Sequence, residues 1–396
     1  MCIQKVNDFS TDIKDILNLL DEDTIFISGW DKAPEILNID NEIIDKIINQ
    51  KQHINTYIMS KDMKEIKEII SNNFIKVGGY SIQNRFTVVS NGTSASFITI
   101  LELMRKGINN FLFIGPIYFT YYHLMKIFNK NMYYYDINLF GDDIINFDTL
   151  FSHISKNNCD CIIIILPFFG SGISLNNSEA QKLIDYCNQN KIYLIIDYIY
   201  GNMDWNKNIT IHNYQLIENV LSSKYCIIYE SMPKRIFLNG IKNAIIYSND
   251  SLISDINRDS EICQGSISYI QESLLDVIYK SPYENLMIKT IGEAIEYAHN
   301  NYELIKTLLH NTDLLVCNSN SGYFTLIGIP IQCFNSSIDL EIVKELKKEC
   351  GILVIPHSRY YYRLNNYFCF RINLSLETST LMNSIKKLLH FYKHRF

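Results

Sequence analysis

The sequence predicts a three-layer α/β/α protein with a mostly parallel sheet, and a second, smaller α+β lobe toward the C-terminus. Short apolar runs alternate with helical patterns through the middle of the chain, as is typical of such sheets. Beyond about residue 285 this alternation gives way to a long helix and mixed elements. The 396 residues also exceed the ~250–300 at which one hydrophobic core stops growing, so two lobes are expected.

The parallel sheet is assigned to six apolar runs of strand length. They are Phe111–Ile114, Met132–Tyr135, Cys161–Leu166, Tyr193–Ile196, Tyr225–Tyr229 and Ala244–Tyr247. The clearest helix between them is Ser178–Asn190, where apolar residues recur at i, i+3, i+4 and i+7 from Ala180. Ser178 and Gln181 predict a capping box at its start. In a sheet of this kind, ligands bind at the carboxyl ends of the strands.

The smaller lobe begins with a helix from about Glu284 to His310. Its other elements are four apolar runs, Leu314–Val316, Tyr323–Ile329, Ile352–Ile355 and Phe368–Leu374, and two helical patterns, Leu340–Cys350 and Leu381–Tyr392. The mixture predicts a small α+β unit packed beside the large sheet.

Composition and charge exclude several classes of protein. Hydrophobic residues make up 47% and charged residues 20%, which is globular rather than disordered. The net charge, 36 − 42 = −6, argues against nucleic-acid binding. The longest apolar run, Cys161–Phe169, is far shorter than the ~20 residues of a membrane span, and no signal peptide is visible. Ten cysteines without a C-x-x-C motif favour reduced thiols in the cytoplasm, and no metal is expected.

Three short segments place reactive or anion-binding groups beside predicted elements. Asp197 follows the run that ends at Ile196, where a carboxylate is costly unless it faces a cation, although a turn or helix cap is the alternative. Lys234 follows the run that ends at Tyr229, where it could equally be a solvated charge. The turn 92–94 opens a helical stretch and leaves N–H groups for an anion such as phosphate, although an ordinary cap has the same pattern.

Together the three segments match the needs of one cofactor. Pyridoxal phosphate requires a lysine for its aldehyde, an anion for its pyridinium nitrogen and a cup for its phosphate. Lys234, Asp197 and the turn 92–94 offer these three groups. The combination is more specific than any one of its members.

With these motifs the chain resembles the fold type I pyridoxal phosphate enzymes, specifically the class I/II aminotransferases, from about Gly29 to the C-terminus. The matching motifs follow the family's order and are Asn91-Gly92-Thr93-Ser94, Pro116-Ile117-Tyr118, Asp197-x-x-Tyr200, Ser231-x-x-Lys234 with Gly240, Gly322-Tyr323-Phe324, Val354-Ile355-Pro356 and Phe370-Arg371-Ile372. The resemblance implies a large cofactor lobe over residues 46–285. It implies a small lobe made from residues 1–45 and 286–396.

The resemblance also implies a role for each matching cofactor residue. Lys234 would form the internal aldimine and then shuttle the α-proton of the substrate. Asp197 would keep the ring nitrogen protonated, and Tyr200 would hydrogen-bond the phenolate oxygen. Tyr118 would stack on the ring, unless it is only a core aromatic. The residues expected at the phosphate are Gly92, Thr93, Ser94, Ser231 and Lys242.

The substrate and the partner subunit are implied in the same way. Arg371 would pair with an α-carboxylate through its planar fork, and Gly29 would bring backbone close to that carboxylate. Tyr57 matches, more loosely, a phenol that reaches the phosphate from the other subunit of a homodimer. The expected ligands are small molecules, an amino acid and a 2-oxo acid.

Two cofactor positions depart from the family pattern. Phe169 stands where an asparagine normally hydrogen-bonds the phenolate oxygen, and a phenyl ring cannot donate that bond. Its loss removes about 1.5–3 kcal/mol of preference for the deprotonated oxygen, which predicts a raised pKa of the internal aldimine. Lys242 stands where the family usually has arginine, so the charge is kept and the fork is lost.

The leading hypothesis is an aminotransferase that moves an amino group between an α-amino acid and a 2-oxo acid. The alternative is another pyridoxal phosphate reaction on an amino acid, such as a lyase, cyclising synthase, decarboxylase or oxidase reaction in a specialised pathway. Phe169 favours that alternative more than the rest of the chain does. A regulator that has kept the cofactor site is disfavoured by the negative charge and by the short stretch before Gly29.

Overall fold

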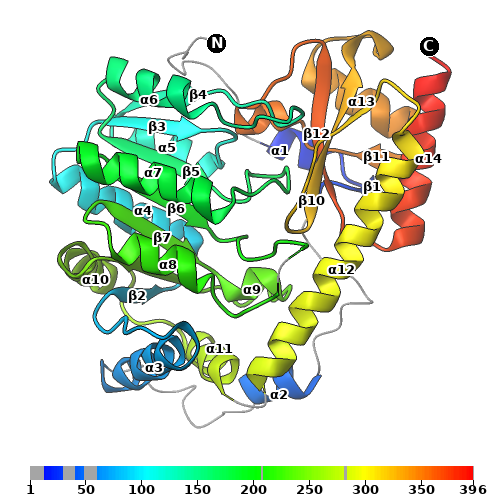
Figure 1. Ribbon diagram of the computed structural model, residues 1–396. Coiled ribbons are helices and arrows are strands. Elements are labelled where there is room, and N and C mark those ends of the chain that lie inside the picture. Colours follow the sequence, from blue (N-terminus) through cyan, green and yellow to red (C-terminus); the bar gives the residue numbers. More distant parts are fainter. Residues whose placement is uncertain (1–12, 30–40, 49–59, 207, 281–282, 396) are drawn as a thin grey trace.

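Figure 1 shows the computed structural model, which describes residues 13–29, 41–48, 60–206, 208–280 and 283–395. A seven-stranded sheet has the order β2-β8-β7-β6-β5-β3-β4, and all neighbours are parallel except that β8 is antiparallel to β2 and β7. Its strands are β2 (Phe86–Val89), β3 (Asn110–Ile114), β4 (Asn131–Tyr135), β5 (Cys161–Ile165), β6 (Tyr193–Tyr198), β7 (Cys226–Glu230) and β8 (Ala244–Ser248). The predicted fold class and the six predicted strands are confirmed, and β2 was not predicted.

Helices cover both faces of this sheet, because its strands are apolar on both sides. Ile162 and Ile164 of β5 belong to one buried cluster, and Ile163 between them belongs to another. The helices that complete the first cluster are α6 (Phe147–Lys156), α7 (Asn177–Asn190) and α8 (Tyr214–Leu221). Those that complete the second are α4 (Gly92–Arg105), α5 (Phe119–Ile127) and α10 (Asp250–Gln264).

The start of α7 differs from the prediction in its cap. The capping box is formed by Asn176 and Glu179 rather than by Ser178 and Gln181. The Asn176 side chain accepts hydrogen bonds from the N–H groups of Ser178 and Glu179, at 2.9 and 3.0 Å. Asparagine is as good a cap as serine, and it comes two residues earlier, so Ser178 lies inside the first turn.

A second, antiparallel sheet has the order β12-β10-β9 and forms the centre of the C-terminal part. Its elements are β9 (Leu315–Val316), β10 (Phe324–Pro330) and β12 (Tyr367–Asn373), with helices α13 (Asp339–Cys350) and α14 (Thr378–Lys393). The long helix α12 (Tyr283–Leu309) runs from the region of α2 (Asn41–Ile48) and α11 (Tyr269–Tyr279) up to this sheet (Figure 1). None of the described helices is long and apolar enough to cross a membrane.

The N-terminal residues lie against this C-terminal part. Strand β1 (Ile25–Phe26) pairs in parallel with β11 (Ile352–Leu353), and α1 (Lys14–Leu17) precedes it. Strand β11 is shorter than the predicted run Ile352–Ile355. The boundaries at residues 45 and 285 stay a prediction, and residue 45 lies within α2. Helix α3 (Ser60–Asn73) packs against α11.

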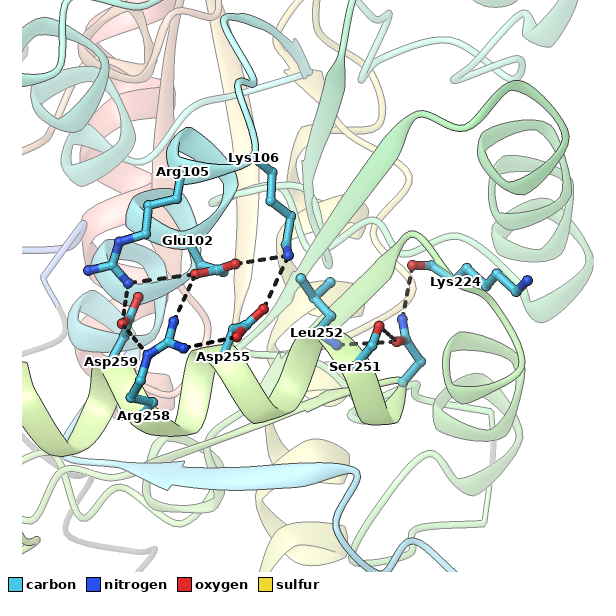
Figure 2. Close-up of polar contacts among 10 residues, drawn as sticks. Glu102, Arg105, Lys106, Lys224, Ser251, Leu252, Asp255, Arg258 and Asp259 are labelled. Carbon is cyan, nitrogen blue, oxygen red and sulfur yellow. Dashed lines mark hydrogen bonds and ion pairs between the residues drawn. The ribbon is translucent and has the colours of Figure 1, made fainter.

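An ion-pair network joins α4 to α10, as Figure 2 shows. Glu102 and Asp259 are buried, at 3% and 1% exposure, and lie among three cations. Arg105 pairs with Asp259, and Lys106 pairs with Glu102 at 3.0 Å. Arg258 reaches both buried carboxylates, at 3.9 and 3.7 Å. The network fixes α4, whose other end carries the predicted phosphate turn.

Replacing Asp259 by asparagine is expected to lower the free energy of unfolding by about 1.5–3 kcal/mol, because its charge-assisted bonds are lost. Denaturant unfolding monitored by circular dichroism measures this difference. Glu68→Gln is the matched control, since Glu68 pairs with Lys64 at 3.9 Å on the surface. That exposed pair should contribute less than about 0.5 kcal/mol. Equal losses of unfolding free energy in the two variants would show that the buried network stabilises the protein no more than an exposed ion pair does.

Candidate active site

One cavity of about 400 Å³ collects the predicted cofactor residues at the carboxyl ends of the strands. All ten that fall within the described residues line it, and these are Gly92, Thr93, Ser94, Tyr118, Phe169, Asp197, Tyr200, Ser231, Lys234 and Lys242. They come from five separate chain segments, which the parallel sheet brings to one edge. Tyr57 lies outside the described residues.

Asp197 lies near the end of β6 with its carboxylate buried in this cavity. Its Oδ2 accepts a hydrogen bond from the Tyr121 hydroxyl at 2.9 Å, and its Oδ1 accepts one from the Ile199 N–H at 3.3 Å. Burial raises the pKa of Asp197 to about 6, and the bond from Tyr121 opposes part of that rise. No cation among the described residues forms an ion pair with Asp197, so its charge is available to a ligand.

Lys234 lies in the short helix α9 (Met232–Arg235), which follows β7 directly. Its Nζ donates to Asn239 Oδ1 at 3.3 Å and lies 5.8 Å from the centre of the Tyr200 ring. Burial, followed by the positive charges of Lys242 and Arg371, lowers the pKa of Lys234 to about 8. The uncharged, nucleophilic fraction of this amine near neutral pH is therefore much larger than in an ordinary lysine, although most of the amine stays protonated below pH 8.

The start of α4 forms another part of the cavity wall. Asn91 caps this helix, since its side chain accepts a hydrogen bond from the Ser94 N–H at 2.9 Å. A Cβ on Gly92 would lie 2.9 Å from Cδ1 of Ile199, so a larger residue would push into the floor of the cavity. Ser231, beside Lys234, donates its hydroxyl to the Asn243 carbonyl at 2.7 Å. A helix N-terminus with hydroxyls and the exposed Lys242 beside it suits a phosphate.

Aromatic and aliphatic side chains form the sides of the cavity. Tyr118 is the N-cap residue of α5, and its ring centre lies 5.3 Å from that of Phe169. Ile199 lines the cavity together with these two rings. The Tyr200 phenol is partly buried, and its desolvation raises its pKa above the ordinary value. Phe169 cannot donate a hydrogen bond, whereas Tyr200, which also lines the cavity, carries a hydroxyl that can.

The two predicted substrate residues lie outside this cavity. Arg371 is buried on β12, and its Nε donates to the Ser28 carbonyl at 3.0 Å. Its guanidinium carbon lies 5.3 Å from the ring centre of Phe169 and 4.7 Å from that of Phe324. The carbonyl of Gly29 accepts from Asn373 at 2.9 Å. Arg371 therefore lies next to the cavity, beside the Phe169 ring, and its charge helps to lower the pKa of Lys234.

The sequence did not identify Tyr121, Asn239 and Asn243 as site residues. Asn239 and Asn243 line the cavity, and Tyr121 contacts Asp197 from behind its wall. The one available signal for Tyr121 was its position three residues after Tyr118, which places both on one side of α5. In a chain with 27 tyrosines this spacing does not stand out.

Comparisons with known proteins show similarity to aminotransferases and to a 1-aminocyclopropane-1-carboxylate synthase. The chain is 21% identical over 345 residues to LL-diaminopimelate aminotransferase of Prochlorococcus marinus (strain MIT 9515), covering 80% of each chain. It is 21% identical over 243 residues to 1-aminocyclopropane-1-carboxylate synthase 7 of Arabidopsis thaliana, covering 59% of this chain and 53% of that protein. The aromatic aminotransferase of Pyrococcus horikoshii OT3 has the same fold, with a TM-score of 0.77, 13% identity, and coverage of 97% and 99%.

The family comparison covers nearly the whole chain. The sequence profile described as "Aminotransferase class I and II" matches residues 18–388. This range includes every described residue that lines the cavity, together with Arg371 and Gly29. The chain belongs to the class I and II aminotransferases, a family of pyridoxal phosphate-dependent enzymes.

Proposed function

We propose that the protein transfers the amino group of an α-amino acid to a 2-oxo acid, with Lys234 as the residue that holds the cofactor. One observation supports this above the others. The cavity brings together a lysine with a lowered pKa, a buried carboxylate without a cationic partner among the described residues, and a helix start suited to a phosphate. A carboxylate in that situation is costly unless a ligand supplies a positive charge. The protonated ring nitrogen of pyridoxal phosphate is such a charge.

When bound, pyridoxal phosphate supplies an electron sink for the bonds at the substrate α-carbon. Lys234 would attach the cofactor and then take and return the α-proton, since its low pKa leaves Nζ free to accept one. Asp197 would hold a proton on the ring nitrogen. Tyr118 and Ile199 would enclose the ring, and Tyr200 would donate to its oxygen. The phosphate would be held by Gly92, Thr93, Ser94, Ser231 and Lys242.

Arg371 would hold the substrate carboxylate, with the backbone of Gly29 beside it. The support is the guanidinium fork, whose Nε is already fixed by Ser28 and which has no carboxylate partner among the described residues. The ring of Phe169, which lines the cavity and lies beside Arg371, would then flank the bound substrate. Assembly as a cytoplasmic homodimer, with Tyr57 reaching the partner's phosphate, belongs to the same proposal. Light scattering on the purified protein tests the assembly.

The reaction is tested by mixing the purified protein with single amino acids while following the cofactor spectrum and the products. Transamination predicts conversion of the cofactor to its pyridoxamine form with release of the matching 2-oxo acid. A second 2-oxo acid should then restore the starting spectrum. Release of ammonia or of a cyclised product, with no pyridoxamine form, would overturn the proposed reaction.

A second candidate is elimination or cyclisation on an amino acid. Phe169 favours it, because the cofactor oxygen loses a donor that transaminases of this family keep. Its support from the comparisons is the similarity to a protein named 1-aminocyclopropane-1-carboxylate synthase, over 59% of this chain. The product analysis described above separates the two candidates.

Restoring the asparagine should change the cofactor's titration. In Phe169→Asn, the pH midpoint of the absorbance change of the bound cofactor should fall by about one to two pH units, since one hydrogen bond to a charged oxygen is added. Phe169→Leu, which alters the ring without adding a donor, is the control and should leave the midpoint near that of the unchanged protein. A midpoint that is the same in all three would show that position 169 does not tune this oxygen.

The low pKa of Lys234 predicts how cofactor attachment depends on pH. The uncharged amine reacts, so the attachment rate in the cofactor-free protein should rise with pH and level off above about 8. An ordinary lysine would still be gaining rate up to its usual pKa near 10.5. Stopped-flow absorbance after mixing with pyridoxal phosphate measures the profile. A midpoint near the ordinary value would mean that the amine is not desolvated.

A further inference from the structure

Two buried tyrosines, Tyr121 of α5 and Tyr229 of β7, lie behind Asp197 and are together called the tyrosine pair. Both side chains are fully buried, and neither lines the cavity. The Tyr121 hydroxyl donates to Asp197 Oδ2 at 2.9 Å. The hydroxyl oxygens of Tyr121 and Tyr229 are 2.8 Å apart. The three polar groups therefore form a continuous chain that leads from the core to the cavity.

The direction of the hydrogen bonds in this chain follows from counting protons. A phenol has one hydrogen to donate, and that of Tyr121 is directed to the ionised carboxylate. Toward Tyr229, the oxygen of Tyr121 can then only accept, so the Tyr229 hydroxyl donates to it. Burial raises the pKa of both phenols well above the ordinary value, so both stay protonated. Each donor in such a chain polarises the next one.

We propose that the tyrosine pair positions Asp197 and holds its carboxylate in the ionised form that keeps a proton on the cofactor ring nitrogen. This inference rests on the role proposed above for Asp197. Tyr121 and Tyr229 are positioning residues in it, since they act through Asp197 and touch neither the cofactor space nor the substrate.

The surroundings of Asp197 leave this task to the tyrosine pair. Its other titratable neighbours are the phenols of Tyr118 on α5 and Tyr200 after β6, whose pKa values its charge helps to raise. On the side of β5, its register partner is the apolar Ile165. No charged side chain of the described residues pairs with Asp197. The Ile199 N–H and the Tyr121 hydroxyl are thus the two groups that favour its ionised form.

Removing single hydroxyls should produce a graded effect. Tyr121→Phe deletes the direct donor, so the dissociation constant of pyridoxal phosphate at pH 7 should rise about tenfold, as expected for one hydrogen bond to a charged group. Tyr229→Phe leaves the direct bond and removes only its polarisation, so a rise of about twofold is expected. Tyr122→Phe is the control, because Tyr122 lies on the same helix and is similarly buried but its ring packs on Tyr361.

Two measurements on reconstituted protein test the inference: the dissociation constant as a function of pH, and the ¹⁵N chemical shift of ring-labelled pyridoxal phosphate. As pH falls, Tyr121→Phe should lose affinity for pyridoxal phosphate at a higher pH than the unchanged protein does. Its ¹⁵N signal should move toward that of the unprotonated nitrogen. Tyr229→Phe should move both observables the same way by less. A purely structural role would lower the melting temperature and leave the ¹⁵N shift where it is.

The outcomes distinguish this inference from the proposed function. If Asp197→Asn moves the ¹⁵N shift but Tyr121→Phe and Tyr229→Phe do not, the tyrosine pair has no positioning role. If Asp197→Asn does not move it either, the role proposed for Asp197 fails, and the inference fails with it. If Tyr122→Phe moves the shift as far as Tyr121→Phe, the effect is a general one of helix α5 and the inference is overturned. Should Tyr121→Phe not fold, Tyr229→Phe alone decides between these results.

Discussion

Lys234→Ala is expected to lower kcat by at least about 10²–10⁴-fold, because one substitution removes both cofactor attachment and the group that moves the α-proton. The characteristic visible absorbance of the attached cofactor should be lost as well. Arginine at this position should not restore activity, since a guanidinium stays charged at all working pH values. Single-turnover kinetics with an amino acid, followed by absorbance, measures both effects. Lys224→Ala is the control, because Lys224 is exposed and lies outside the cavity.

A chemical label can contradict this assignment. Borohydride reduction fixes the cofactor on its lysine, and peptide mass analysis then identifies that residue. Two lysines line the cavity, Lys234 and Lys242, so the label discriminates between real candidates. The expected label is on Lys234, whose amine is the desolvated one, and a label on Lys242 would exchange the two proposed roles.

Asp197→Asn is expected to lower kcat by about 10²–10³-fold, which is typical of losing one preorganised electrostatic partner. It should also remove a pH dependence. In the unchanged protein the carboxylate is lost as pH falls through about 6, so affinity for pyridoxal phosphate should weaken below that pH. The asparagine variant should bind weakly and without this inflection. Equilibrium dialysis across pH 5–8 measures both proteins.

The same substitution should stabilise the cofactor-free protein. The pKa of Asp197 is raised in the folded state, so its contribution to stability is favourable at low pH and is lost as pH rises through about 6. At pH 7–8 the cofactor-free Asp197→Asn variant should therefore have a higher free energy of unfolding, by on the order of 2–3 kcal/mol. Denaturant unfolding measures this difference. Addition of pyridoxal phosphate should reverse the order of the two proteins. A variant that is less stable in both states would show that the buried charge is already compensated within the protein.

The sequence predicted most of the large sheet because its strands are apolar on both faces and stand out as runs. Strand β2 was missed, since the threonine in Phe86–Val89 interrupts its apolar run. The cap of α7 was placed two residues too late because Asn176 and Ser178 are equally good caps, and the choice between them depends on where the chain enters the helix.

The candidate site was predictable where it depends on strand ends, and less so elsewhere. Asp197 lies near the end of β6 and Lys234 follows the neighbouring parallel strand β7, so topology alone brings them to the same edge. The contact between Tyr121 and Asp197 joins residues that are 76 positions apart, and no local pattern marks it. Arg371 comes from the other sheet, so its place beside the cavity depends on how the two sheets pack.

The pairing of β1 with β11 has a consequence for the order in which the protein can fold as it is synthesised. Ile25 pairs with Ile352, so the first strand has no partner until more than three hundred further residues have left the ribosome. The seven-stranded sheet, whose last strand ends at Ser248, can close well before that. Strand β1 must therefore wait, exposed, beside a part of the protein that is already folded. In the nascent chain, the segment that holds β1 is then open to chaperones and proteases until β11 has been made.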